Sequence, residues 1–127
     1  MKVLALDYGS ARTGVAVSDP TGTVARPLCI VERASSEAGI ARLRELVQEQ
    51  QAERVVVGLP LTLRGERGAQ AAETERFVAH LQAAVGVPVE TFDERFTTAL
   101  AGPGAGEDAR AAAHLLAGYL EWSGRRS

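Results

Sequence analysis

Residues 3–18 read VLALDYGSARTGVAVS, and this stretch decides the fold class. Its first five residues form an apolar run that ends at Asp7, and a second apolar run covers residues 13–18. The five residues between the two runs are few enough for a hairpin connection. We therefore predict two neighbouring antiparallel strands, with Asp7 at the end of the first.

The chain downstream predicts a third antiparallel strand and then alternating helices and strands. Residues 19–22, Asp-Pro-Thr-Gly, have the chemistry of a turn, and an apolar segment follows from about Thr23 to Glu32. The predicted helices, found from apolar residues at helical spacing, cover residues 36–51, 68–85 and 108–122, and the predicted strands between them cover residues 54–59 and 87–92. We therefore expect one α/β domain over residues 1–127, with a mixed five-stranded sheet (an antiparallel meander, then parallel strands) flanked by helices.

Composition indicates a globular protein of the cytoplasm. The chain is 46% hydrophobic and 24% charged, which excludes the intrinsically disordered class. No apolar run approaches the roughly 20 residues of a membrane-spanning helix, and Asp7 comes too early for a signal peptide. The single cysteine, Cys29, excludes an internal disulfide and a cysteine-based metal site, and its apolar neighbours predict a buried structural thiol.

The overall charge opposes simple binding to a polyanion. The net charge is −2 and the isoelectric point is about 5.7, whereas sequence-independent binding to nucleic acid usually depends on lysine and arginine. If two divalent cations covered three carboxylates, however, the local charge would become positive. A nucleic-acid partner therefore requires a metal site.

Three acidic residues occupy positions where strands end or helices begin. Asp7 ends the first strand, Glu94 lies just past the strand that ends at Phe92, and Asp108 opens the last helix. In open α/β sheets such positions converge at one edge. Carboxylate oxygens suit Mg²⁺ and Mn²⁺, and a pair of these ions can promote phosphodiester hydrolysis. Each acid alone also fits a turn, a loop or a helix cap, so the prediction of a catalytic metal site depends on all three converging.

Four blocks of the sequence resemble the YqgF family, whose members are described as RuvC-like, as Holliday-junction-resolvase-like and as pre-16S rRNA nucleases. The blocks are residues 4–19, 57–65, 93–98 and 108–120, and they span nearly the whole chain in the expected order. The resemblance implies an RNase H-like fold and a divalent-metal-dependent nuclease. It implies a role in ribosome biogenesis, at the 5′ end of pre-16S rRNA, or in resolving branched DNA.

The resemblance also assigns residues and partners. Asp7, Glu94 and Asp108 would be the catalytic ligands of Mg²⁺ or Mn²⁺. The candidate phosphate-binding residues are Arg12, Arg64, Arg67 and Arg95, of which the last could instead orient a carboxylate. We expect a nucleic-acid partner, no membrane association, and a monomer or weak homodimer.

The sequence departs from the family between the Thr97-Thr98 pair and Asp108. Relatives carry a longer and more basic segment there, whereas residues 99–107 of this chain are mostly Gly, Pro and Ala. A small change of register would put Glu107 in place of Asp108, so the identity of the third acid stays open. The family's usual surface for substrate is also reduced.

Two other functions compete with the nuclease hypothesis. Asp7-Tyr8-Gly9 matches the start of the phosphate loop in actin-like ATPases and sugar kinases, although those proteins use two such domains. A non-catalytic module that binds RNA or an assembling ribosomal particle is the second alternative. Two features weaken a catalytic site: the shortened segment, and the lack of a fourth acid one turn into the last helix, where junction resolvases often have one and this chain has Ala111 and Ala112.

Overall fold

The computed structural model describes residues 1–61, 64–66, 68–94 and 109–126. Its elements in chain order are β1 (Val3–Asp7), β2 (Arg12–Ser18), β3 (Ala25–Glu32), α1 (Glu37–Gln50), β4 (Arg54–Leu59), α2 (Ala69–Ala84), β5 (Val89–Asp93) and α3 (Arg110–Arg126). All the strands and helices that the sequence predicts are present, with bounds that differ by a few residues.

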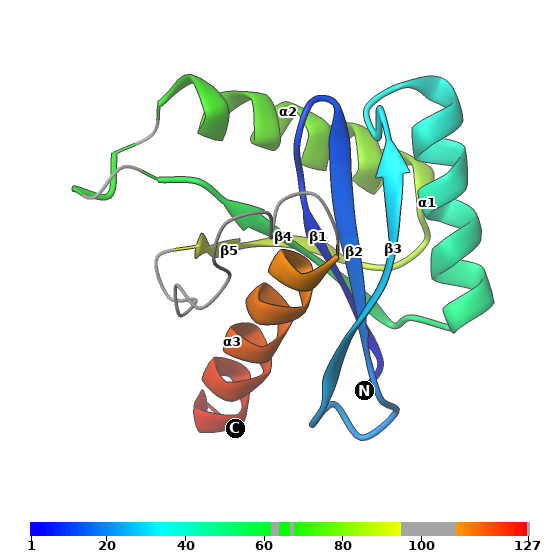
Figure 1. Ribbon diagram of the computed structural model, residues 1–127, viewed down its shortest axis with the longest axis vertical. Helices are drawn as coiled ribbons and strands as arrows, with labels where there is room; N and C mark the ends of the chain where they lie inside the picture. Colours follow the sequence, from blue (N-terminus) through cyan, green and yellow to red (C-terminus); the bar gives the residue numbers. More distant parts are fainter. Residues whose placement is uncertain (62–63, 67, 95–108, 127) are drawn as a thin grey trace.

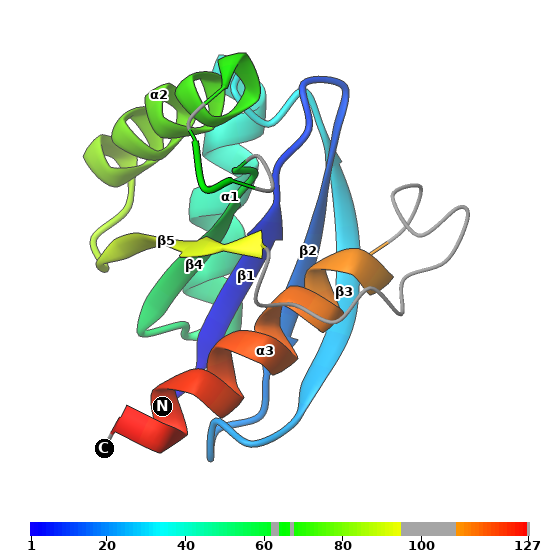
Figure 2. The same ribbon diagram turned by 90° about the vertical axis from the view of Figure 1, so that its left-hand side faces the viewer.

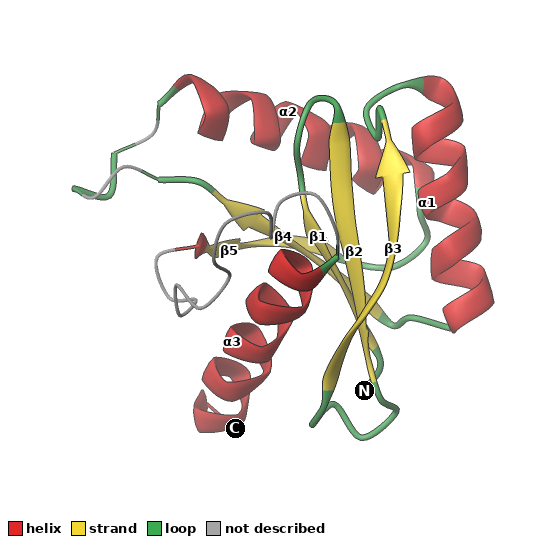
Figure 3. Ribbon diagram, in the orientation of Figure 1, coloured by secondary structure: helices red, strands yellow, loops and turns green. Residues whose placement is uncertain are grey.

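The strands form one mixed sheet with the order β3-β2-β1-β4-β5 (Figures 1 and 3). β1 pairs antiparallel with β2, and β2 pairs antiparallel with β3. β1 pairs in parallel with β4, and β4 with β5. This arrangement confirms the predicted meander followed by parallel strands, and it puts β1 at the centre of the sheet.

Helices cover both faces of the sheet, α1 and α2 on one side and α3 on the other (Figure 2). Because successive side chains of a strand point to opposite faces, β1 contributes side chains to the core on both faces of the sheet. Leu4 and Leu6 pack in the core beneath α1 and α2, whereas Val3 and Ala5 pack against α3. The same alternation places Asp7 on the face that α3 covers.

The connection from β1 to β2 is held closely against the sheet. The buried Thr13 hydroxyl lies 3.3 Å from both the N–H and the carbonyl oxygen of Gly9. A Cβ atom at Gly9 would lie 2.5 Å from the carbonyl oxygen of Arg12, so only glycine allows this approach. The loop that follows Asp7 is therefore held in place by its own backbone.

Two sequence predictions are modified by the structure. The third strand begins at Ala25 rather than Thr23, because the Asp19 carboxylate accepts hydrogen bonds from the N–H groups of Thr23 and Val24, each at 2.8 Å, and holds them in the turn. Cys29 is half-buried rather than buried, since β3 is an edge strand. Burial still raises the pKa of its thiol.

Within the described residues, none of the helices is both long enough and apolar enough to cross a membrane.

Candidate active site

Two of the three predicted acids meet at the carboxyl-terminal edge of the parallel strands. Asp7 is the last residue of β1, and Glu94 directly follows the last residue of β5. In β5, Phe92 packs in the core under α3, and the alternation of side chains puts Glu94 on the same face. Asp7 and Glu94 therefore share one face and one edge of the sheet.

The two carboxyl groups interact directly. Both residues are half-buried, and a side-chain hydrogen bond between the two carboxyl groups lowers the pKa of Asp7 and raises that of Glu94. Burial, the negative charge of Asp7, this hydrogen bond and the charge of Asp93 raise the pKa of Glu94 to about 7. Burial also raises the pKa of Asp7, although the hydrogen bond from Glu94 opposes the rise. Near neutral pH the pair thus holds a proton where two charges would repel.

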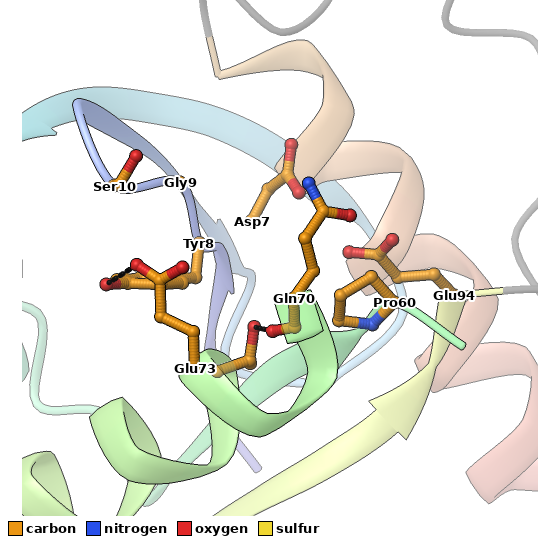
Figure 4. A pocket seen from close by; sticks show the side chains of 9 residues that line it. Asp7, Tyr8, Gly9, Ser10, Pro60, Gln70, Glu73 and Glu94 are labelled. Atoms are coloured by element: carbon orange, nitrogen blue, oxygen red, sulfur yellow. Dashed lines mark hydrogen bonds between the residues drawn. The ribbon is translucent and has the colours of Figure 1, made fainter. Parts of the chain in front are cut away.

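A cavity of about 260 Å³ opens beside the pair (Figure 4). Its lining comes from the end of β1 and its loop, the residue after β4, helix α2 and the residue after β5: Asp7, Tyr8, Gly9, Ser10, Pro60, Gln70, Glu73, Thr74 and Glu94. In Figure 4 the Gln70 side chain rises from α2 and is seen between the two acids. The lining is mostly polar, as expected of a site that binds a polar or charged ligand.

Contacts between Tyr8 and α2 hold the cavity wall together. The Tyr8 ring stacks on Phe77, with ring centroids 4.3 Å apart and planes 18° apart. Its hydroxyl donates a hydrogen bond of 3.3 Å to Glu73 Oε1. Because Tyr8 is the neighbour of Asp7 in the chain, these contacts fix the loop that carries the first acid.

The sequence analysis did not predict that α2 forms a wall of the cavity. Gln70 and Glu73 stand three positions apart, so they lie on one side of a helix, but this spacing alone does not say what that side meets. The sequence did indicate a position near the site for Tyr8, because this residue lies inside the Asp7-Tyr8-Gly9 motif. The cavity is created by packing between segments more than 60 residues apart.

The other predicted residues divide into two groups. Arg12 and Arg64 are exposed and are not among the described residues that line the cavity. Asp108, its alternative Glu107, and the arginines Arg67 and Arg95 lie outside the described residues. The first described residue after this gap, Ala109, is buried, and α3 then packs on the face that carries Asp7.

The chemistry of the pair fits a hard divalent cation. Asp7 and Glu94 offer carboxylate oxygens, which Mg²⁺ and Mn²⁺ prefer, and the negative charge of Asp7 raises the cost of ionising Glu94. A cation would remove that cost. In the described part of the chain, no set of three or more His, Cys, Asp or Glu residues is arranged to hold a metal. The two acids are thus two members of the predicted ligand set, whose predicted third member lies outside the described residues.

Known proteins resemble this chain in sequence. A protein of Chloroflexus aurantiacus named "Putative pre-16S rRNA nuclease" is 50% identical over 99 residues, which cover 78% of this chain and 65% of the relative. The chain thus matches somewhat under two thirds of that relative. A protein of the same name from Moorella thermoacetica is 41% identical over 137 residues, with 98% of each chain covered.

Solved structures share the fold. The RuvC of Thermus thermophilus, in a complex with a Holliday junction substrate, superposes with a TM-score of 0.64 at 20% identity and covers all of this chain and 96% of its own. A Fowlpox virus resolvase with Holliday junction DNA has a TM-score of 0.56 at 11% identity, covering 97% of this chain and 99% of its own. These similarities confirm the predicted RNase H-like fold.

A family model described as "RuvX: Holliday junction resolvase" matches residues 1–122. Because that match covers almost the whole chain, and the sequence relatives agree with it, the chain belongs to the RuvX family, which is the YqgF family of its sequence motifs.

Proposed function

We propose that this protein is a divalent-metal-dependent nuclease that hydrolyses phosphodiester bonds in the 5′ region of pre-16S rRNA, in the cytoplasm. The observation that carries the proposal is the pair formed by Asp7 and Glu94, two half-buried carboxyl groups that interact with each other and line the same polar cavity. Such a pair is costly for the fold alone, and perturbed carboxyl groups in a cavity mark functional sites. The names of the sequence relatives support the choice of RNA.

We propose the roles of the residues from the family motif together with the geometry of Asp7 and Glu94. Asp7 and Glu94 would hold Mg²⁺ or Mn²⁺, with Asp108 as the proposed third ligand and Glu107 as its alternative. When bound, the cation supplies positive charge that neutralises the phosphate and stabilises the leaving oxygen. Glu94 must lose its proton before it can serve as a ligand, and the rigid strand ends hold both carboxylates ready.

The substrate-facing residues are also part of the proposal. Gln70, whose amide lies at the cavity, can donate to a phosphate oxygen or accept from a ribose hydroxyl. We assign Arg12, Arg64, Arg67 and Arg95 to the phosphates that flank the cleaved bond, because arginine binds phosphate bidentately.

A cleavage panel tests the proposal. The substrates are a 5′ precursor fragment of 16S rRNA, an unrelated single-stranded RNA and a four-way DNA junction, each with Mg²⁺, Mn²⁺ or excess EDTA. Asp7→Asn keeps the shape of the side chain and removes its charge, and Glu45→Gln on the exposed side of α1 is the matched control. We expect cleavage of the precursor to fall about 100-fold or more in Asp7→Asn, to vanish in EDTA, and to persist in the control.

Each other outcome is informative. Equal cleavage by wild type and Asp7→Asn would assign the activity to a contaminant and contradict the proposal. Metal-dependent cleavage of the junction alone would establish a nuclease of branched DNA instead. Holliday junction DNA is the substrate bound in the two structural relatives. Tight binding of the precursor without any cleavage would establish a non-catalytic module.

A further inference from the structure

Gly58 is a glycine inside a buried strand, where glycine normally weakens the structure. It lies in β4 between Val57 and Leu59, and it is paired in register with Phe92 of β5. Among the described residues, the glycines with positive φ are Gly22 and Gly65, so the backbone at Gly58 is one that any residue adopts. Glycine in a strand interior often marks a close approach by another group.

The group that approaches Gly58 is the side chain of Glu94. A Cβ atom at Gly58 would lie 2.7 Å from Glu94 Oε1 and 2.9 Å from Glu94 Cγ. It would also lie 3.1 Å from Leu115 Cδ2 of α3. Glu94 therefore occupies the space that a side chain at Gly58 would fill, with Leu115 at its border.

The close contacts at Gly58 differ in kind from those at two other glycines. At Gly9 and Gly39, an added Cβ would meet backbone carbonyl oxygens, at 2.5 Å from Arg12 and 2.2 Å from Arg33. A side chain there would disturb the path of the chain. At Gly58 the nearest atoms belong to side chains that can rotate, so a methyl group would displace Glu94 and leave the fold intact.

We infer that Gly58 is a positioning residue, whose missing side chain forms the recess that holds the Glu94 carboxylate beside Asp7. The catalytic meaning of this inference rests on the proposed nuclease function, whereas the packing relation between Gly58 and Glu94 does not. Metal ligands must stand within about 0.2 Å of their required distances. A shift of Glu94 by the several tenths of an ångström that a Cβ demands is thus enough to spoil a metal site.

A double-mutant cycle tests the inference. The proteins are wild type, Gly58→Ala, Glu94→Ala and the double variant, and Gly86→Ala is the control because a Cβ at Gly86 would meet nothing within 4 Å. The melting temperature of each metal-free protein reports on packing. The dissociation constant for Mn²⁺ and the cleavage rate report on the site.

We expect Gly58→Ala to fold, to weaken Mn²⁺ binding and cleavage by roughly 10- to 100-fold, and to differ clearly from Gly86→Ala, which stays at wild-type values. With Glu94 truncated, the recess is empty and accepts the added methyl group. Gly58→Ala should therefore change the melting temperature more favourably in the Glu94→Ala background than in the wild type, by at least about 2 °C. If Gly58→Ala folds only in the Glu94→Ala background, that rescue also supports the inference.

Two results would overturn it. Additive melting temperatures across the cycle would show that Gly58 and Glu94 do not compete for space, and any loss of activity would then have another cause. Unchanged Mn²⁺ affinity in Gly58→Ala would show that Glu94 keeps its position beside Asp7. Because melting and Mn²⁺ binding need no substrate, both results stand even if the protein cleaves no nucleic acid.

Discussion

Two polar clusters lie on the same face of the sheet, one near each end of β5. Each contains a glutamate, which faces a positive charge in one cluster and a negative charge in the other. Near the start of β5, Glu90 accepts a hydrogen bond from the Tyr119 hydroxyl and pairs with Arg54, whose Nη1 lies 3.4 Å from Glu90 Oε1. Arg54 Nη1 also donates to Tyr119 Oη at 2.9 Å. Beyond the other end, Glu94 meets the carboxylate of Asp7 instead.

The difference separates a structural cluster from the one that we propose is functional. Each member of the first cluster has a partner that compensates it, although the Nε atom of Arg54 is buried without a hydrogen bond. In the second cluster, burial and the charge of Asp7 raise the pKa of Glu94 to about 7. A like-charged pair in a cavity costs stability and is retained where a cation or a substrate supplies the missing positive charge.

The largest expected effect compares the two glutamates directly. Glu94→Gln should reduce metal-dependent cleavage about 100-fold, because an amide cannot replace a carboxylate as a ligand of a hard cation. Glu90→Gln, a change of the same size on the same strand, should change cleavage by less than about 2-fold. The measurement is the initial rate of cleavage at saturating metal. Equal losses of cleavage rate in the two variants would contradict the distinction between the two clusters.

The second effect is on metal affinity. Since Glu94 has a pKa of about 7 and must lose its proton to bind a cation, the association constant for Mn²⁺ should rise about 10-fold per pH unit below pH 7 and level off above it. Calorimetric titration from pH 5.5 to 8.5 measures this. In Asp7→Asn the levelling should move to lower pH, because the neighbouring charge is gone; a flat profile in the wild type would exclude proton release from Glu94.

A smaller effect is expected at the compensated cluster. Arg54→Met keeps most of the apolar stem but leaves Glu90 and Tyr119 without a cation. The Arg54 and Glu90 side chains are 34% and 41% exposed, so solvent screens the pair and the loss should be about 1 kcal/mol, or about 4 °C in melting temperature. Cleavage should remain within about 2-fold of wild type. A large loss of cleavage with an unchanged melting temperature would show that Arg54 contributes to activity rather than to stability.

The smallest effect is the pH dependence of stability. The pKa of Glu94 is higher in the folded protein, about 7, than its ordinary value of 4.5. Its contribution to stability is therefore full below pH 4.5 and is lost as the pH rises through 7. Because Glu94 is only half-buried, solvent screens much of this effect, so metal-free wild type should lose about 3 °C more in melting temperature between pH 5 and pH 8 than Glu94→Gln does. Parallel curves for the two proteins would contradict the raised pKa.

Local patterns in the sequence were sufficient for the elements and for the sheet. The amphipathic segment that forms α1 shows a helical period because one of its faces is buried. The β-branched run at residues 54–59 is continuous because both faces of β4 are buried. Ser36 caps α1 by accepting a hydrogen bond from the Gly39 N–H at 3.0 Å, as serine commonly does at the start of a helix. The resemblance to the family supplied the pairing of Asp7 with Glu94, which lie 87 positions apart in the sequence.

Other features of the site had no local signal. Nothing near Gln70 or Glu73 in the sequence says that this side of α2 lines a cavity with the end of β1. Gly58 had a weak signal, a glycine that interrupts an apolar run, but the identity of its neighbour depends on how β4, β5 and α3 pack together.

The sequence by itself determined the order and type of the elements, the mixed sheet and the family, because these follow from periodicity, turn chemistry and motifs that neighbouring residues carry together. Only the tertiary structure decided that burial and Asp7 raise the pKa of Glu94, that α2 forms a wall of the cavity, and that Gly58 leaves space for Glu94. The physical reason is that desolvation, charge repulsion and close packing depend on distances between segments that are remote in the chain, and such distances exist only once the sheet and its helices have assembled.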